Sequence, residues 1–135
     1  MVKRRYNCHY GCPVEATLDV IGGKWKGIIL FHLLDQPQRF GELHRLIVDV
    51  TQRMLTLQLR ELEEDGVVHR EVFKQVPPKV EYSLTEFGRS LSPIIHLMRD
   101  WGEQYAEALS QKQRVVIADA NDVRPAPVNN RNAPA

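Results

Sequence analysis

The segment 39–85 constrains the fold most, because it carries two helical patterns followed by two strand patterns around a pair of prolines. The first helical pattern covers 39–47, and its apolar residues recur at helical spacing: Phe40, Leu43, Leu46 and Ile47. Thr51 can cap a second helix, in which Leu55, Leu59 and Leu62 form one apolar stripe until Gly66 ends it. Two short helices followed by a ribbon are typical of a DNA-reading unit.

The face of the second helix opposite its leucine stripe is mostly polar. At the helical period this face presents Arg53, Thr56, Leu57, Arg60 and Glu64, with Gln52 on its border. Arginine can pair with guanine and glutamine with adenine through two hydrogen bonds, and a recognition helix presents such residues from its N-terminal half. We therefore expect DNA contacts from Thr51, Gln52, Arg53, Thr56 and Arg60. Acidic residues at 61 and 63–65 would be repelled by phosphate, so this end should leave the groove; a solvated helix face is the alternative.

Two runs rich in β-branched and aromatic residues, 67–74 and 80–84, predict a hairpin. Pro77 and Pro78 cannot lie inside a paired strand, so they mark its tip. Lys74 and Lys79 flank that tip, where they would meet the phosphate backbone and position the protein without reading sequence.

These residues resemble the HxlR-type winged helix-turn-helix transcription regulators, which are related to the MarR group. The motifs that carry the resemblance run over roughly residues 8–108 and are Cys12-Pro13-Val14, Gly22-Gly23-Lys24-Trp25, Arg39-Phe40-Gly41-Glu42-Leu43, Gln52-Arg53-Met54-Leu55-Thr56, Leu59-Arg60-Glu61-Leu62-Glu63, Asp65-Gly66, Val80-Glu81-Tyr82-Ser83-Leu84-Thr85 and Gly88. The resemblance implies a mainly α fold with a small β-hairpin wing, and a dimeric repressor or activator that binds specific double-stranded DNA. Relatives often carry Ser at the position of Thr51, which keeps the capping hydroxyl.

Length and charge agree with a small regulator, since 135 residues suffice for one compact domain with a single core. The net charge is only +1, but DNA binding responds to the local field. The cations expected toward DNA include two on the first helix, Arg39 and His44. The sequence has no glycine-rich phosphate loop, no paired carboxylates outside solvated helix faces and no Ser-His-Asp pattern, which argues against an enzyme and predicts no cofactor.

Three regions are expected along the chain: an N-terminal arm at 1–12, a winged helix-turn-helix domain at 13–112 and a disordered tail at 113–135. The domain should begin with helices at 13–21 and 24–34, with Lys26 solvated rather than bound to phosphate. The basic N-terminus is followed by no apolar stretch, and no run of about 20 apolar residues exists, so we expect a cytoplasmic protein without a membrane segment.

After the wing, Thr85 can cap a long helix kinked at Pro93. Its apolar stripe runs past what one small core can bury, and its expected dimer contacts are Leu91, Ile95, Met98, Trp101 and Tyr105. A homodimer would address two half-sites of a pseudo-palindromic operator about 34 to 36 Å apart. The alternative is a helix that folds back to complete a monomeric core.

Cys12 precedes Pro13 at a helix start, where backbone amides and nearby cations favour a thiolate. In some relatives of the resembled family the matching cysteine senses oxidants or electrophiles such as quinones. Cys8 is a candidate resolving thiol, pairing with Cys12 of its own chain or of a partner. The alternative role for Cys12 is a small buried packing residue.

Three further alternatives stay open. Cys8, His9 and Cys12 are too few for a structural zinc site, and no second paired motif accompanies them, so no metal is predicted. A small aromatic effector could bind between Trp25, Phe31 and the long helix. A winged-helix module that binds protein rather than DNA would leave Gln52, Arg53, Thr56 and Arg60 free to change.

Overall fold

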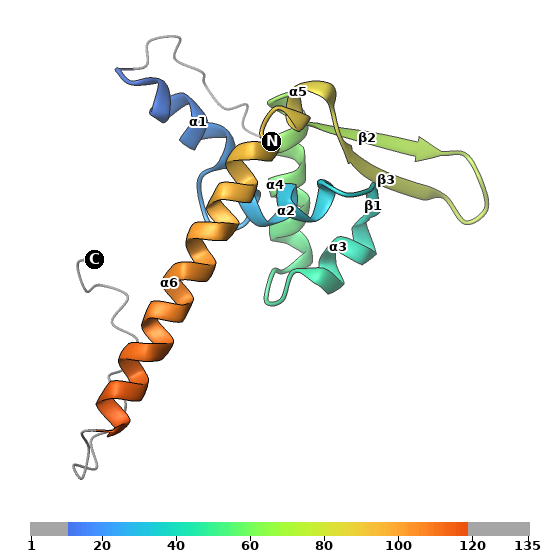
Figure 1. Ribbon diagram of the computed structural model, residues 1–135. Helices are drawn as coiled ribbons and strands as arrows, with labels where there is room; N and C mark the ends of the chain where they lie inside the picture. Colours follow the sequence, from blue (N-terminus) through green and yellow to red (C-terminus); the bar gives the residue numbers. More distant parts are fainter. Residues whose placement is uncertain (1–10, 119–135) are drawn as a thin grey trace. The chain divides into compact units, whose positions relative to one another are not determined.

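The computed structural model describes residues 11–118, with side chains over 11–112, and its contacts divide the chain into two units that meet between His96 and Leu97. Six helices and three strands make up the described residues (Figure 1). In chain order they are α1 (Pro13–Ile21), α2 (Lys26–Leu33), β1 (Gln38–Arg39), α3 (Phe40–Leu46), α4 (Gln52–Glu64), β2 (Val68–Phe73), β3 (Lys79–Leu84), α5 (Glu86–Arg89) and α6 (Ser92–Ala118).

The first unit is a winged helix-turn-helix, as the sequence predicts. Its core is formed by apolar side chains of α2, α3, α4 and the sheet, and the most deeply buried are Ile29, Leu30, Leu33, Leu43, Leu55, Leu59, Leu62, Val67 and Val68. In α4 the buried leucines form one apolar stripe, and burial of such apolar surfaces packs the helices against one another and against the sheet.

The predicted hairpin is confirmed, and it belongs to a three-stranded antiparallel sheet in the order β1-β3-β2. β2 pairs with β3 from Val68 opposite Leu84 to Phe73 opposite Lys79. β1 was missed, because it has only two residues and owes its extended form to pairing of Gln38 with Tyr82 and Arg39 with Glu81. In Figure 1, β2 and β3 extend as a ribbon away from α2, α3 and α4.

The second helix of the motif matches its prediction closely. The Thr51 hydroxyl accepts a hydrogen bond from the Met54 N–H at 3.1 Å, which caps α4. Leu55, Leu59 and Leu62 are all buried, and Gly66 follows the helix at φ +78°, a conformation that favours glycine.

The first helix of the motif begins one residue later than predicted. Arg39 lies in β1 and serves as the N-cap of α3, and its backbone N–H donates to the Glu42 carboxylate at 2.9 Å. Leu43 and Ile47 face the core, but Leu46 is 47% exposed, so its expected place in the apolar stripe was wrong. Leu46 is the last residue of α3, and the chain leaves helical geometry at Ile47.

The predicted long helix after the wing is in fact two helices. Thr85 caps the short α5, where its hydroxyl accepts from the Gly88 N–H at 2.9 Å. Pro93 lies in the first turn of α6 rather than at a kink, because a proline there needs no N–H partner while inside a helix it would clash with the preceding turn. The apolar stripe continues from α5 into α6, so the sequence pattern did not indicate the break between the two helices.

The start of the predicted tail and the start of the second predicted helix both change. α6 extends to Ala118, so 113–118, predicted as tail, is helical, and 119–135 lies outside the described residues. α1 occupies 13–21 as predicted, whereas α2 starts at Lys26 rather than residue 24. Residues 1–10 of the predicted arm lie outside the described residues as well.

Candidate nucleic-acid interface

The N-terminal half of α4 presents the side chains expected to read bases. Thr51, Gln52 and Arg53 are exposed, and Thr56 is partly exposed. The Thr56 hydroxyl donates to the Gln52 carbonyl at 2.9 Å, so its methyl group and lone pairs are what it offers to a partner. The leucine stripe on the other side of α4 is buried, and it therefore fixes which face points outward.

An ion pair joins α2 to the C-terminal half of α4. The Lys26 ammonium lies 2.7 Å from the Glu61 carboxylate, and the Lys26 side chain is 7% exposed. The prediction that Lys26 is solvated was therefore wrong, because its partner lies on a helix distant in sequence. Glu61, expected to face away from DNA, is used inside the protein to hold α4 against α2.

The wing carries both expected lysines, in different environments. Lys74 is exposed, next to the tip of the ribbon. Lys79 lies 3.4 Å from the Glu81 carboxylate and 4.9 Å from the centre of the Phe73 ring. Val76 at the tip is fully exposed, a feature that the sequence reasoning passed over. Lys74 is thus the lysine with the more accessible charge.

Arg39 and His44 were expected among the cations facing DNA. Arg39 is exposed at the start of α3. The His44 Nε2 atom lies 3.0 Å from the Val50 carbonyl, and its ring stacks on Phe40 with 6.3 Å between centres. His44 therefore braces the turn between α3 and α4, where Asp49 takes the left-handed conformation at φ 72°.

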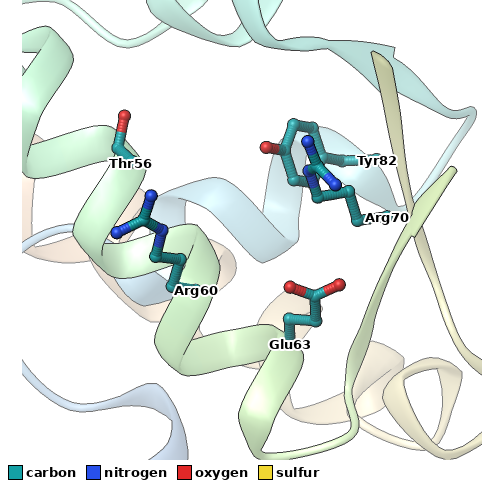
Figure 2. Close-up of a pocket in the computed structure, with 5 residues that line it drawn as sticks. All are labelled: Thr56, Arg60, Glu63, Arg70 and Tyr82. Atoms are coloured by element: carbon teal, nitrogen blue, oxygen red, sulfur yellow. The ribbon is translucent and has the colours of Figure 1, made fainter. Parts of the chain in front are cut away.

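Two residues that sequence reasoning missed, Arg70 of β2 and Tyr82 of β3, line a hollow of about 340 Å³ beside α4 (Figure 2). Its opposite wall is formed by three α4 residues: Thr56, Arg60 and Glu63. Arg70 and Tyr82 are cross-strand partners, which the hairpin register would have revealed had it been worked out. Arg60, expected to face DNA, thus lies at the hollow between α4 and the wing.

Cys12 lies at the N-cap of α1, as expected, and is an exposed free thiol. Its exposure removes the alternative of a buried packing residue. Its carbonyl accepts the Glu15 N–H at 2.9 Å, which begins the helix. Cys8, His9 and the basic residues Lys3, Arg4 and Arg5 lie outside the described residues, so their distance from Cys12 is not given by the structure. In residues 11–118, no three His, Cys, Asp or Glu side chains form a cluster that could hold a metal ion.

The expected dimer contacts fall into two groups. Ile95 is 3% exposed in the core of the first unit, and Leu91 packs partly buried against that core. In the second unit, Met98, Trp101 and Tyr105 are exposed, and the rings of Trp101 and Tyr105 stack at 5.4 Å. The first group therefore serves this chain's own core, whereas the second group is exposed.

Trp25 and Phe31, considered as walls of an aromatic-ligand site, are partly buried against the core. Phe31 meets the His32 ring edge-on at 5.4 Å, and the Lys24 ammonium lies 4.7 Å from the centre of the Trp25 ring. Each ring thus has one such contact within the protein.

The family model of HxlR-like helix-turn-helix proteins matches residues 20–110, which span α2 through most of α6. The chain belongs to the HxlR-like family. This membership makes it a helix-turn-helix DNA-binding transcriptional regulator rather than an enzyme, as expected from the sequence.

Curated relatives in the HxlR-like family support the same class. The HTH-type transcriptional regulator YdeP of Bacillus subtilis (strain 168) is 68% identical over 101 residues, which are 75% of this chain and 79% of YdeP. YybR of the same organism is 64% identical over 107 residues, covering 79% of this chain and 86% of YybR.

Solved structures of HxlR-like relatives include redox regulators. The reduced form of the redox regulator HypR is 64% identical, has a TM-score of 0.70 and covers 74% of this chain and 99% of HypR. The reduced form of the regulator YodB from B. subtilis is 37% identical, has a TM-score of 0.62 and covers 73% of this chain and 98% of YodB. Among the helices described in residues 11–118, none is long and apolar enough to cross a membrane.

Proposed function

We propose that this HxlR-like protein is a cytoplasmic repressor that reads a specific operator with the N-terminal half of α4. The observation that carries the proposal is the pairing of a fully buried leucine stripe with exposed Gln52 and Arg53 on the opposite side of the same helix. A helix fixed in this way presents its side chains to the major groove without first having to be ordered.

Phosphate contacts come from the cations around that helix. Lys74 and Lys79 on the wing and Arg39 at the start of α3 would contact the DNA backbone, and the exposure of Arg39 and Lys74 supports this role. Such contacts set the orientation of the protein and add affinity for any sequence. Lys74 contributes more than Lys79, because Lys79 already has a carboxylate partner in Glu81.

A homodimer forms through the exposed face of α6. Met98, Trp101 and Tyr105 give this part of the helix large apolar side chains with no cover from the described residues of its own unit. A second copy would bury these side chains, and a two-fold pair would carry two copies of α4 to half-sites about 34 to 36 Å apart on pseudo-palindromic DNA.

Modification of Cys12 controls operator binding. An exposed thiol at a helix start can add as a thiolate to the ring of a quinone, or be oxidised by a peroxide to a sulfenic acid. The sulfenic acid then condenses with a second thiol, such as that of Cys8, with loss of water. Support comes from the redox regulator HypR, which is 64% identical, and from YodB, solved after diamide treatment.

Base reading is tested by comparing two exposed cations. Arg53→Ala should cost about 1 to 3 kcal/mol on DNA selected by the protein from a random pool, and little on random-sequence DNA. Lys74→Ala is the matched control. It should lower the affinity for both DNAs alike and reduce the salt dependence of binding by about one unit of slope. Equal losses on both DNAs for Arg53→Ala would remove Arg53 from the base-reading set.

A further inference from the structure

The hollow between α4 and the sheet is lined by charged side chains to which the proposed function has assigned no role. Figure 2 shows Thr56, Arg60 and Glu63 from α4 on one side, and Arg70 and Tyr82 from the strands on the other. The volume, about 340 Å³, is large enough for a phosphate group and its bonded sugar oxygens. Arg60 and Arg70, which line the hollow, are both exposed.

The two guanidinium groups in this hollow are available for a ligand. Within residues 11–112, neither Arg60 nor Arg70 has a hydrogen bond or ion pair, unlike Lys26, Lys79 and Arg99, which each have a carboxylate partner. Tyr82 is 8% exposed as a residue, and its hydroxyl end borders the hollow. Three donor side chains from three elements, α4, β2 and β3, therefore line one hollow.

Arginine favours anions that accept two parallel hydrogen bonds, and a phosphodiester is such an anion. A helix lying in the major groove has the sugar-phosphate backbone along its flanks, and the hollow lies on the flank of α4 that faces the wing. We propose that this hollow seats one backbone phosphate of the bound DNA, held by Arg60, Arg70 and the Tyr82 hydroxyl. The inference rests on the proposed function, because it assumes that α4 enters the groove.

Glu63 should act against phosphate binding in this hollow, opposite to the two arginines. Its carboxylate lines the same hollow and repels a phosphate there, so the positive charge of the two arginines is partly offset. Loss of this charge strengthens binding to any DNA sequence. The carboxylate thus lowers the affinity of the protein for DNA of any sequence.

The test measures fluorescence anisotropy on a random-sequence duplex and on a selected operator, between about 50 and 200 mM KCl, the range over which phosphate contacts show. The variants are Arg70→Gln, Tyr82→Phe and Glu63→Gln, with Arg89→Gln as an exposed arginine that does not line the hollow. Thermal melting verifies that each variant folds as the wild type does.

Arg70→Gln should lower the affinity for both DNAs about tenfold at the lowest salt concentration. It should also reduce the salt slope by about one, as loss of one phosphate contact requires. Tyr82→Phe should weaken both DNAs about threefold. Glu63→Gln should strengthen binding to both DNAs. Arg89→Gln should leave the affinity for each DNA unchanged.

If Arg70→Gln left the affinity for DNA and the salt slope unchanged, the proposal would be overturned. A loss of affinity confined to the operator would overturn it as well, because it would make Arg70 a base reader. If the wild type shows no preference for its selected site, the proposed function fails. The slope on random DNA still tests the phosphate seat in that case.

Discussion

Gly88 shows how a single residue holds the wing to the helices. A Cβ at this position would lie 2.1 Å from the Val67 carbonyl oxygen, a distance that backbone atoms cannot accept. The same junction is tied by Thr85, whose hydroxyl donates to the Gly66 carbonyl at 2.6 Å and accepts from the Gly88 N–H. The start of β2 is therefore fixed against α5 by close backbone approach.

Gly88→Ala should lower the free energy of unfolding by about 2 to 3 kcal/mol, because the backbone must shift to admit the methyl group. Gly102→Ala is the matched control, since a Cβ there meets no described atom and alanine favours a helix by up to about 1 kcal/mol. Urea denaturation of both variants measures the difference. Equal stabilities would mean that the two backbones separate easily.

His32 carries a pH dependence. Partial burial lowers the pKa of its imidazole, because the charged form loses hydration. The unfolded chain therefore binds the proton first as the pH falls below about 6.5, and stability present above that pH is lost.

His32→Gln should consequently lose less stability than the wild type between about pH 7.5 and pH 5.5, the interval in which the unfolded chain takes up the proton. Urea midpoints at the two pH values measure the effect in each protein. A wild-type loss equal to that of the variant would show that protonation of His32 does not contribute.

At the scale of elements, the sequence predicted α4 well because every signal for it is local. Thr51, the leucine stripe and Gly66 lie within one segment, and each acts through neighbours in the chain. The α2–α4 ion pair could not be found in this way, since Lys26 and Glu61 meet only after both helices pack. The same reason hid β1, and it hid the closeness of Arg70 and Tyr82 to α4.

Lys26→Met tests what that ion pair contributes. Removal of the ammonium leaves the Glu61 carboxylate, 19% exposed, without its partner, and should cost about 3 kcal/mol of stability. The double variant Lys26→Met with Glu61→Gln should recover at least half of the loss, because no lone charge remains. Chemical denaturation of both proteins gives the comparison; a single variant as stable as the wild type would contradict it.

At the scale of the whole molecule, dimerisation through α6 is the proposal that joins two reading helices. Trp101→Glu places a charge on the exposed apolar face, and should shift the protein from dimer to monomer in sedimentation velocity. Ser110→Glu adds the same charge to the same helix off the stripe, and should leave the dimer intact. Dimers of unchanged stability with Trp101→Glu would place the contact elsewhere.

Sequence patterns predicted the fold, the exposed face of α4 and the position of Cys12 correctly, but they treated the apolar stripe of α6 as one surface. Ile95 is buried in the first unit while Trp101 is 65% exposed, although both fit the same helical period. Helical periodicity shows that apolar side chains lie on one face of a helix. It does not show whether that face is buried by the core of the same chain or by another chain.

The most direct measurement is an anisotropy titration of the wild type and Cys12→Ser on DNA from upstream of the gene for this protein, with random DNA as control. Each is measured in dithiothreitol and again after diamide. The account predicts tight upstream binding by both proteins, weakened by diamide and restored by reductant in the wild type alone. No preference for upstream or selected DNA over random DNA would contradict sequence reading by α4, and an equal diamide response in Cys12→Ser would contradict the switch.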